Sequence, residues 1–354
     1  MRVKNNQYNT YLSKFDEVFQ NLIKSKYIHE CSIHIEDADG DFTYFSGHGG
    51  RTVDSPMILT SVSKLFTTTC ILNLVEQGKL SFEDKLSKFF ASDILGEIHI
   101  FKGKDYSYDL TVEHLLFQTT GFPDVFAVGK NNLNTQLCKG DITVSFDEYV
   151  RIAKECKKKF APGTRGKAHY SDLNFEMLGK IIEQLENSSL HDAYKKYIFI
   201  PLELKNTYLP ENDSYFVPNI YYKDNALYEP NTIRSLPACG GLVSTSRETM
   251  RFLKAFFDGG LFDKEIFTQL RKFATIQYAP PLGQYGGGFV RLNISGIGNL
   301  FRATGELIGH MGASGTYAYY YPEKGIYFVG DVNQLASVAK VFTIPVQLAN
   351  IVTD

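Results

Sequence analysis

The sequence lacks the short motifs that identify most cofactor-dependent enzymes. It contains no G-x-x-x-x-G-K-[ST] phosphate-binding loop, no G-x-G-x-x-G dinucleotide loop, no H-E-x-x-H zinc motif and no G-x-S-x-G nucleophile turn. The five cysteines are an odd number without a C-x-x-C pair, which argues against a zinc knuckle and against a complete disulfide framework. We therefore expect no metal and no other cofactor, and free thiols in a reducing compartment.

An excess of one charge and a long apolar run are also missing. Lys and Arg (37) nearly balance Asp and Glu (39), and the net charge of -2 gives no general electrostatic reason to bind nucleic acid or an acidic membrane. No stretch of about 18 uncharged apolar residues occurs, and the first residues lack the apolar segment of an export signal. We expect no nucleic-acid partner, no integral membrane segment and a cytoplasmic location.

The sequence does contain enough apolar residues for a large core. It has 354 residues, of which 44% are hydrophobic, so one large domain or two intertwined domains are expected. Apolar side chains at helical spacing predict helices over residues 7–26, 61–77, 173–185, 190–199 and 335–351. Alternating or β-rich segments predict a hairpin over residues 31–45 and strands over residues 288–294, 315–321 and 326–331. A further helix is expected to open after Gly240, and residues 212–231 are expected to form a long surface loop.

Strands at both ends of the chain, with helices between them, indicate one sheet assembled from distant segments. We expect an α+β protein in which residues 1–80 and 232–354 form a sheet domain. Residues 81–231 would then be a mostly helical inserted region. The sequence contains no internal repeat that would indicate a different division of the chain.

A possible nucleophile lies at the start of one of the predicted helices, in the segment Ser61-Val-Ser-Lys64. Three residues are just under one helical turn, so Lys64 lies on the same face as Ser61 and its amine can reach the hydroxyl. A nearby amine can activate a serine as a nucleophile, and the start of a helix favours negative charge that develops there. The same spacing recurs at Ser337 and Lys340, so the pattern alone does not exclude an ordinary helix start.

The surrounding motifs are more specific, because they follow one another in a characteristic order. Through them the sequence resembles the serine β-lactamase and DD-peptidase (penicillin-binding protein-like) superfamily, most closely its class C β-lactamase-like branch. The resemblance covers most of the chain and is carried by Ile58-Leu-Thr-Ser-Val-Ser-Lys-Leu-Phe-Thr67, Leu115-Leu-Phe-Gln-Thr-Thr-Gly-Phe-Pro123, Pro162-Gly-Thr164, Tyr170-Ser-Asp172, Leu178-Gly-Lys-Ile-Ile-Glu183, Gly240-Gly-Leu-Val-Ser-Thr245, Tyr285-Gly-Gly-Gly-Phe289 and Gly309-His-Met-Gly312. It implies a multi-layer α/β/α fold with an antiparallel sheet flanked by helices.

The resemblance also implies a role for each matching residue. Ser61 would be the acylated nucleophile and Lys64 its proton acceptor or hydrogen-bond partner. Tyr170, as a phenolate or as a phenol that relays a proton, would share the base role and protonate the leaving group. His310 would replace the Lys that is usual in the third motif, and the backbone N–H groups of Ser61 and Ala313 would form the oxyanion hole. The alternatives are that Tyr170 is a packing aromatic residue and that His310 is a hydrogen-bonded strand residue.

Two positions depart from the family pattern, and both concern the part of the site that would bind substrate, to which Gly312 also belongs. Asp172 stands where Asn is usual, and a charged carboxylate there would raise the pKa of Lys64 and weaken it as a base. Tyr170 would then matter more. Either Asp172 or Ser171 would also cap the helix that follows. Met311 stands where a Thr commonly helps to hold a substrate carboxylate, and a thioether cannot donate that hydrogen bond.

The expected function is therefore a serine hydrolase that cleaves a small ester, amide or peptide through an acyl-enzyme on Ser61. The departures at Asp172 and Met311 lower the expectation of efficient β-lactam hydrolysis or removal of a terminal D-alanine. They leave two alternatives. One is a penicillin-binding or peptide-sensing module that turns over weakly or not at all. The other is a DD-carboxypeptidase or β-lactamase proper.

Overall fold

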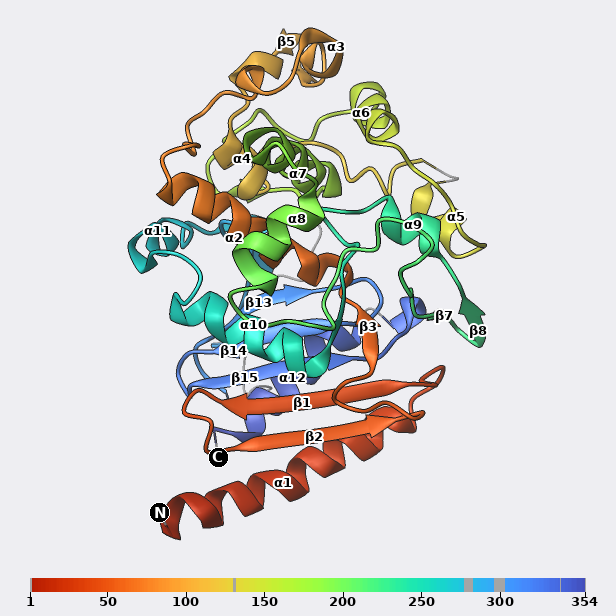
Figure 1. The fold of residues 1–354 in the computed structure, drawn as a ribbon, viewed down its shortest axis with the longest axis vertical. Helices are drawn as coiled ribbons and strands as arrows, with labels where there is room; N and C mark the ends of the chain where they lie inside the picture. Colours follow the sequence, from red (N-terminus) through yellow and green to blue (C-terminus); the bar gives the residue numbers. More distant parts are fainter. Residues whose placement is uncertain (1, 130–131, 277–282, 296–302, 338, 354) are drawn as a thin grey trace.

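A large, mainly antiparallel sheet forms the lower half of the molecule (Figure 1). The computed structural model describes residues 2–129, 132–276, 283–295, 303–337 and 339–353. Within these residues the sheet has nine strands, in the spatial order β2 (Thr43–His48), β1 (Cys31–Asp37), β15 (Ile326–Asp331), β14 (Tyr317–Tyr321), β13 (Glu306–Met311), β12 (Val290–Asn293), β11 (Gly283–Tyr285), β10 (Ala274–Ile276) and β6 (Lys167–Ala168).

The centre of the sheet joins the two ends of the sequence. Strand β1 pairs antiparallel with β15, with Ser32 opposite Asp331 and Ile35 opposite Phe328. All six residues of β15, including Asp331, are buried, because helices cover both faces of the sheet. The predicted hairpin is present as β1 and β2, and three further predicted strands are present as β12, β14 and β15.

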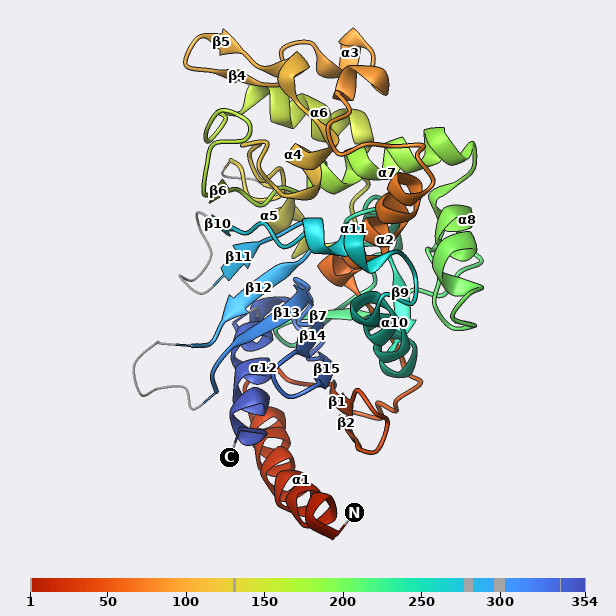
Figure 2. The ribbon, with the colours of Figure 1, turned by 90° about the vertical axis from the view of Figure 1, so that its left-hand side faces the viewer.

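Helices from distant parts of the chain cover the two faces of the sheet (Figure 2). Helix α10 (Ser246–Asp258) packs on β1, β14 and β15 from one side. Helix α12 (Lys340–Ile351) packs on β13 and β14 from the other side, next to α1 (Arg2–Ile23), which lies along β2. The predicted α+β fold, an antiparallel sheet flanked by helices, is therefore confirmed.

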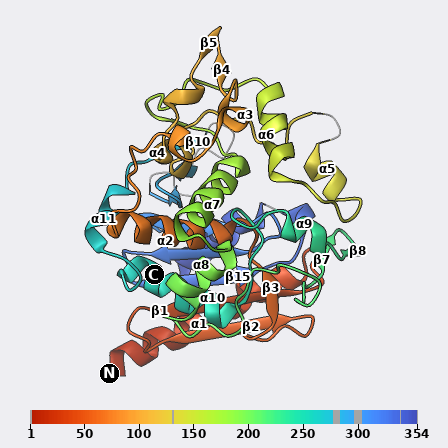
Figure 3. The same ribbon diagram turned by 45° about the horizontal axis from the view of Figure 1, so that its top comes forward.

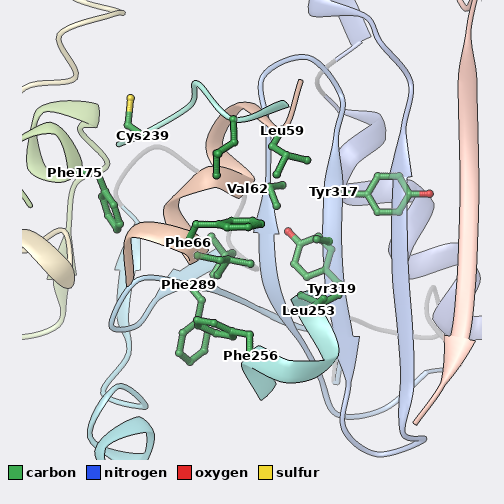
Figure 4. Close-up of a cluster of buried hydrophobic side chains, with 14 of the residues drawn as sticks. Leu59, Val62, Phe66, Phe175, Cys239, Leu253, Phe256, Phe289, Tyr317 and Tyr319 are labelled. Atoms are coloured by element: carbon green, nitrogen blue, oxygen red, sulfur yellow. The ribbon is translucent and has the colours of Figure 1, made fainter. Parts of the chain in front are cut away.

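Helix α2 (Ser63–Glu76), preceded by a 3-10 turn (Thr60–Val62), lies between the sheet and the upper, mostly helical part. Eleven of its fourteen residues are buried, because the helix contacts β13 below it and α7 (Asp172–Glu186) above it. Phe66 stacks on Phe252 of α10 with ring centroids 3.6 Å apart. Figure 4 shows Phe66 within a cluster of buried apolar side chains. This packing holds the first turn of α2 against α10, which itself packs on the sheet.

The upper part consists of short helices, loops and small two-stranded sheets (Figure 3). Its helices are α3 (Ser92–Leu95), α4 (Val112–Leu116), α5 (Leu133–Leu137), α6 (Phe146–Glu155), α7, α8 (Leu190–Tyr194, continued by a π-helical turn over Lys195–Phe199) and α9 (Pro230–Arg234). Helix α11 (Lys264–Gln269) follows α10. The small sheets pair β3 (Pro56–Ile58) with β9 (Val243–Thr245), β4 (Ile100–Phe101) with β5 (Lys104–Asp105), and β7 (Ile220–Tyr222) with β8 (Asn225–Leu227).

The structure differs from the sequence-based expectation in several segments. The helix expected to open after Gly240 begins only at Ser246, because residues 243–245 form strand β9. The expected loop over residues 212–231 contains the β7–β8 hairpin and the first residues of α9, because tyrosines in this polar stretch pair across strands. Strand β13 was not among the expected strands, since Gly309 interrupts its short apolar run. Strand β6 lies within the segment expected to be helix and loop, yet it pairs in parallel with β10 at the edge of the large sheet. Among the described helices, none is both long enough and apolar enough to cross a membrane.

A close contact between the sheet and the turn before α2 involves Gly312, directly after β13. A Cβ atom at Gly312 would lie 1.7 Å from the hydroxyl oxygen of Thr60 and 2.8 Å from the carbonyl oxygen of Leu59. Real Cβ atoms do not approach other atoms so closely, so only glycine allows the end of β13 to lie against this turn. Thr60 itself has a positive φ of 42°, a conformation that is uncommon outside glycine.

We expect the Gly312→Ala variant to be less stable by about 1–3 kcal/mol, because the added methyl group must push the turn away from β13. Urea unfolding followed by circular dichroism measures this difference. The matched control is Gly260→Ala, where an added Cβ atom would have no neighbour closer than 3.7 Å. Equal stability of the two variants would contradict the close contact.

Candidate active site

Ser61 lies where strand β3 leads into helix α2 through the 3-10 turn. The left-handed conformation of Thr60 turns the chain sharply, so that Ser61 borders two cavities at the junction of the sheet and the helical part. Ser63, one residue from the turn, is fully buried and accepts a hydrogen bond from the backbone N–H of Leu242 at 3.2 Å. The hydroxyl group next to the cavities is therefore that of Ser61, and Ser63 has a structural role.

Lys64 is completely buried and reaches Ser61 as the sequence spacing predicts. Its Nζ donates to Ser61 Oγ at 3.2 Å, to Asp172 Oδ1 at 2.6 Å and to the carbonyl oxygen of Cys239 at 2.7 Å. An ammonium group has three N–H donors, and each has an acceptor here. Burial by itself would lower the pKa of Lys64, but the nearby carboxylate of Asp172 outweighs it and the pKa is raised. Lys64 is therefore an ammonium ion at neutral pH.

Tyr170 is the second side chain that donates a hydrogen bond to the nucleophile. Its hydroxyl donates to Ser61 Oγ at 2.8 Å, and Lys64 Nζ lies 4.9 Å from the centre of its ring. Burial, and next the charge of Asp172, raise the pKa of Tyr170 well above its ordinary value. The phenol form is therefore favoured over the phenolate, because the same carboxylate that holds the proton on Lys64 also holds it on Tyr170.

Asp172 is the first residue of α7 and points toward Lys64. Ser171, one of the two residues expected to cap this helix, occupies the N-cap position, but its hydroxyl makes no capping hydrogen bond and donates instead to the carbonyl oxygen of Pro123 at 2.8 Å. An acidic side chain in the first turn is favourable next to the positive end of a helix. The carboxylate therefore interacts with both the helix start and the ammonium group.

His310 lies near the nucleophile but is bonded to other groups. Its Nε2 is 3.2 Å from the hydroxyl of Tyr285, and its Nδ1 is 2.9 Å from both the backbone nitrogen and the carbonyl oxygen of Met311. Burial, followed by the positive charge of Lys64, lowers the pKa of His310 to about 3. The imidazole is therefore neutral at neutral pH. The ring of Tyr170 lies 6.2 Å from it, so these aromatic rings form one wall of the site.

The first of the two cavities at Ser61 has a volume of about 240 Å³ and is mostly apolar. Met311, Gly312 and Ala313 line it along the end of β13, which brings the predicted oxyanion-hole residue Ala313 to the same cavity as Ser61. Ile276, Val290 and Phe342 line it as well. Among the described residues that line this cavity, none is Lys or Arg.

Glu176 and Cys239 lie near Lys64 but were not identified as site residues from the sequence. Glu176 accepts hydrogen bonds from the backbone N–H groups of Ala238 at 3.2 Å and of Cys239 at 3.0 Å. It thereby holds the segment whose Cys239 carbonyl oxygen accepts from Lys64. Burial raises the pKa of Glu176 to about 7. The sequence carries one signal for Glu176, since it follows Asp172 by four residues and so lies on the same helix face.

The site therefore contains a serine hydroxyl between an ammonium group and a phenol, next to an apolar cavity. In the described part of the chain, no cluster of three or more His, Cys, Asp or Glu side chains is arranged to bind a metal ion. A hydroxyl with two such neighbours can exchange protons with both while it forms a bond to a carbonyl carbon. The arrangement suits acyl transfer.

Comparison with known proteins supports this chemistry. The model of the Beta-lactamase family matches residues 37–350. The chain is 22% identical to D-alanyl-D-alanine-carboxypeptidase/endopeptidase AmpH of Escherichia coli (strain K12) over 309 residues, which are 81% of this chain and 75% of that protein. It is also 22% identical to Beta-lactamase-like protein 2 of Dictyostelium discoideum over 209 residues, which are 57% of this chain and only 36% of that relative.

The fold agrees with that of a solved structure. EstCE1, described as a hydrolase with promiscuous acyltransferase activity, matches with a TM-score of 0.79 at 17% sequence identity, over 98% of this chain and 99% of the other. The resemblance inferred from the ordered motifs is confirmed, and the serine-hydrolase class is supported. Because the family match extends over most of the sequence, this chain belongs to the β-lactamase family.

Proposed function

We propose that this serine hydrolase cleaves a small, largely apolar ester or amide through an acyl-enzyme formed on Ser61. One observation carries the proposal: Ser61 Oγ accepts hydrogen bonds from both Lys64 Nζ and Tyr170 Oη at the edge of an apolar cavity. A serine hydroxyl is a weak nucleophile unless a neighbouring group removes its proton, and both neighbours are within reach here.

In the proposed acylation step, Lys64 acts in its amine form. The amine takes the proton of Ser61 as Oγ bonds to the substrate carbonyl carbon, and the carbonyl oxygen becomes an oxyanion. The backbone N–H groups of Ser61 and Ala313 would stabilise that charge. Tyr170 then gives its hydroxyl proton to the leaving group and recovers one from Lys64, so that the carbon–leaving-group bond breaks with the proton balance kept.

In the proposed deacylation step, water attacks the ester on Ser61 from the cavity. The amine of Lys64 takes one proton of the water, either directly or through Tyr170, which passes its own proton to Lys64 as it accepts that of the water. The Lys64 ammonium then returns a proton to Ser61 Oγ as the bond from Oγ to the acyl carbon breaks, and the free acid leaves. His310 takes no proton in either step, because its pKa of about 3 makes it a very weak base and its ring nitrogens are hydrogen-bonded to Tyr285 and Met311. We assign it to the wall of the cavity, where it positions substrate.

The substrate class is inferred from the lining of the cavity. Met311 cannot donate a hydrogen bond to a carboxylate, and no described lining residue of the cavity carries a positive side chain. A substrate with a free carboxylate in this cavity would leave that charge without a partner, which is costly away from water. AmpH is named as a carboxypeptidase and endopeptidase, but these features favour an uncharged ester or amide for this chain.

One observation favours a second candidate function, in which Ser61 is acylated but the acyl group is released only slowly. Asp172 keeps Lys64 protonated at neutral pH, so the amine needed for both steps is scarce. A burst of one equivalent of product without further turnover would favour this alternative over an efficient hydrolase.

We place the proposed reaction in a reducing compartment. All five cysteines are free thiols, and Cys31, Cys70 and Cys239 are buried in the core. Such thiols are typical of proteins that fold where disulfides do not form.

We expect Ser61→Ala to reduce the hydrolysis of p-nitrophenyl esters by roughly 10³-fold or more, because no acyl-enzyme can form. Mass spectrometry of the intact protein after brief reaction with an ester or a fluorescent penicillin should show an acyl group on the wild type and none on the variant. Ser63→Ala is the matched control and should still be acylated, because Ser63 only accepts a backbone hydrogen bond. Acylation that persists in Ser61→Ala would exclude Ser61 as the nucleophile.

We expect Asp172→Asn to move the ascending limb of the kcat/KM profile, on which the rate rises as Lys64 loses its proton, to lower pH. Asp172 raises the pKa of Lys64, so without the carboxylate the effect of burial prevails and the amine form appears at lower pH. The rate at pH 7 then rises by roughly tenfold for each pH unit by which the limb moves. Initial rates measured between pH 5 and 10 test this.

The control for this variant is Asp147→Asn, an exposed aspartate in the first turn of α6. It makes the same change at another helix start and should leave the pH profile in place. If the limb of Asp172→Asn stays where it is or moves to higher pH, Lys64 is not the base.

A further inference from the structure

Ser61 also lines a second cavity, of about 90 Å³, on the side of the helical part. Ser61 and Ala313 border both cavities, so a group bound in the second cavity lies next to the same reacting hydroxyl. The second cavity differs in character from the first. Asp172 and Glu229 line it together with apolar side chains such as Phe126 and Ile233.

Glu229 has no partner for its charge. Its side chain is only 2% exposed, and neither carboxylate oxygen has a hydrogen-bond partner among the described residues. Asp172, the other acidic residue of the cavity, is neutralised by Lys64. No described residue that lines the cavity is Lys, Arg or His. A buried carboxyl group without partners is rare in folded proteins and costs free energy, so its presence needs an explanation.

The local structure does not explain Glu229. It precedes the short helix α9, where an acidic side chain could accept the first backbone N–H groups, but it makes no such bond. Asp141 takes these N–H groups instead, from Asn231 at 3.1 Å and from Thr232 at 2.8 Å. The single proton of the Thr232 hydroxyl lies within reach of Asp141 at 3.0 Å and of the carbonyl oxygen of Ile142 at 3.1 Å. This hydroxyl is near enough to lower the pKa of Glu229 slightly, but it is not at hydrogen-bond distance from the Glu229 oxygens.

The electrostatics of Glu229 fit a group that awaits a cation. Burial, and next the charge of Asp141, raise the pKa of Glu229 to about 7. The carboxyl is therefore close to half ionised at neutral pH, and a positive group in contact with it would favour the ionised form. A charge-assisted hydrogen bond from an ammonium group would satisfy both the unpartnered oxygens and the charge.

We infer that Glu229 binds an ammonium group of the substrate, so that the ester or amide cleaved at Ser61 carries an amine on the side that enters the second cavity. The inference rests on the proposed hydrolysis at Ser61. It adds that the two cavities select opposite ends of the substrate: the first takes an apolar group, and the second takes a short chain that ends in an amine. The limited volume of the second cavity restricts that chain to a few heavy atoms.

The test compares Glu229→Gln with the wild type on matched substrates. These are p-nitroanilides of short ω-amino acids and of the ω-hydroxy acids of the same length, which differ mainly in the positive charge. We expect the wild type to favour the free amine at least tenfold in kcat/KM, and Glu229→Gln to lose that preference, a change of about 1.4 kcal/mol. The loss of preference should come from a lower kcat/KM on the amine-bearing substrates. Glu76→Gln, an exposed glutamate at the end of α2, is the matched control and should behave as the wild type.

A second measurement does not depend on the variant folding correctly. Butylamine should inhibit the wild type at a concentration at least tenfold lower than butanol does, with an uncharged p-nitrophenyl ester as substrate. Equal inhibition by the two compounds, or no preference of the wild type for amine-bearing substrates, would overturn the role of Glu229.

Failure of the proposed hydrolysis gives a different result. In that case Ser61 is not acylated by any ester or anilide. The role of Glu229 is then tested by calorimetry, which measures the binding of butylamine and of butanol to Ser61→Ala, a variant that retains Glu229 in the second cavity. Binding of butylamine but not butanol would support the ammonium site. Equal or absent binding of both would overturn it.

Discussion

The buried ion pair between Lys64 and Asp172 is the interaction on which the site depends. The ammonium group gives its three N–H donors to Ser61, Asp172 and Cys239, which belong to the turn before α2, the start of α7 and the segment before β9. Transfer of a charge from water into the interior is costly, and the cost is offset only when every donor has an acceptor. One ammonium group therefore fixes the relative positions of three distant segments, and loss of one acceptor would weaken the hold on the other two.

The same pair determines the protonation of its neighbours. The carboxylate of Asp172 keeps the proton on Lys64 and contributes to keeping it on Tyr170, while the positive charge of Lys64 contributes to the low pKa of His310. The resting site thus holds an ammonium, a phenol and a neutral imidazole around Ser61. The stability of this arrangement opposes the chemistry proposed for it, because an amine must first form. An asparagine in place of Asp172 would lack the charge that causes this opposition.

Much of the fold and part of the site could be predicted from the sequence, because these features depend on local patterns. Alternation and helical spacing located β1, β12, β14, β15 and α2, and the three-residue interval placed Lys64 beside Ser61. The effect of Asp172 on Lys64 followed from charge alone. Contacts between distant segments left no local signal: the hydroxyl of Ser171 bonds to Pro123, and Glu229 lacks a partner because Asp141 from another loop replaces it at the start of α9. The separation into a sheet domain and an inserted helical region remains a prediction, and β6 shows that the inserted segment contributes a strand to the sheet.

The pairing of β1 with β15 also constrains how the chain is made. Ser32 lies opposite Asp331, so β1 leaves the ribosome roughly 300 residues before its partner. At a synthesis rate of about 5–20 residues per second, β1 waits on the order of 15–60 s with one edge unpaired. During that time it can pair only with β2, and a two-stranded hairpin is marginally stable in water. The nascent chain thus exposes one edge of β1 until β15, in the last tenth of the sequence, is synthesised, and an unpaired strand edge of this kind can pair with another chain and aggregate.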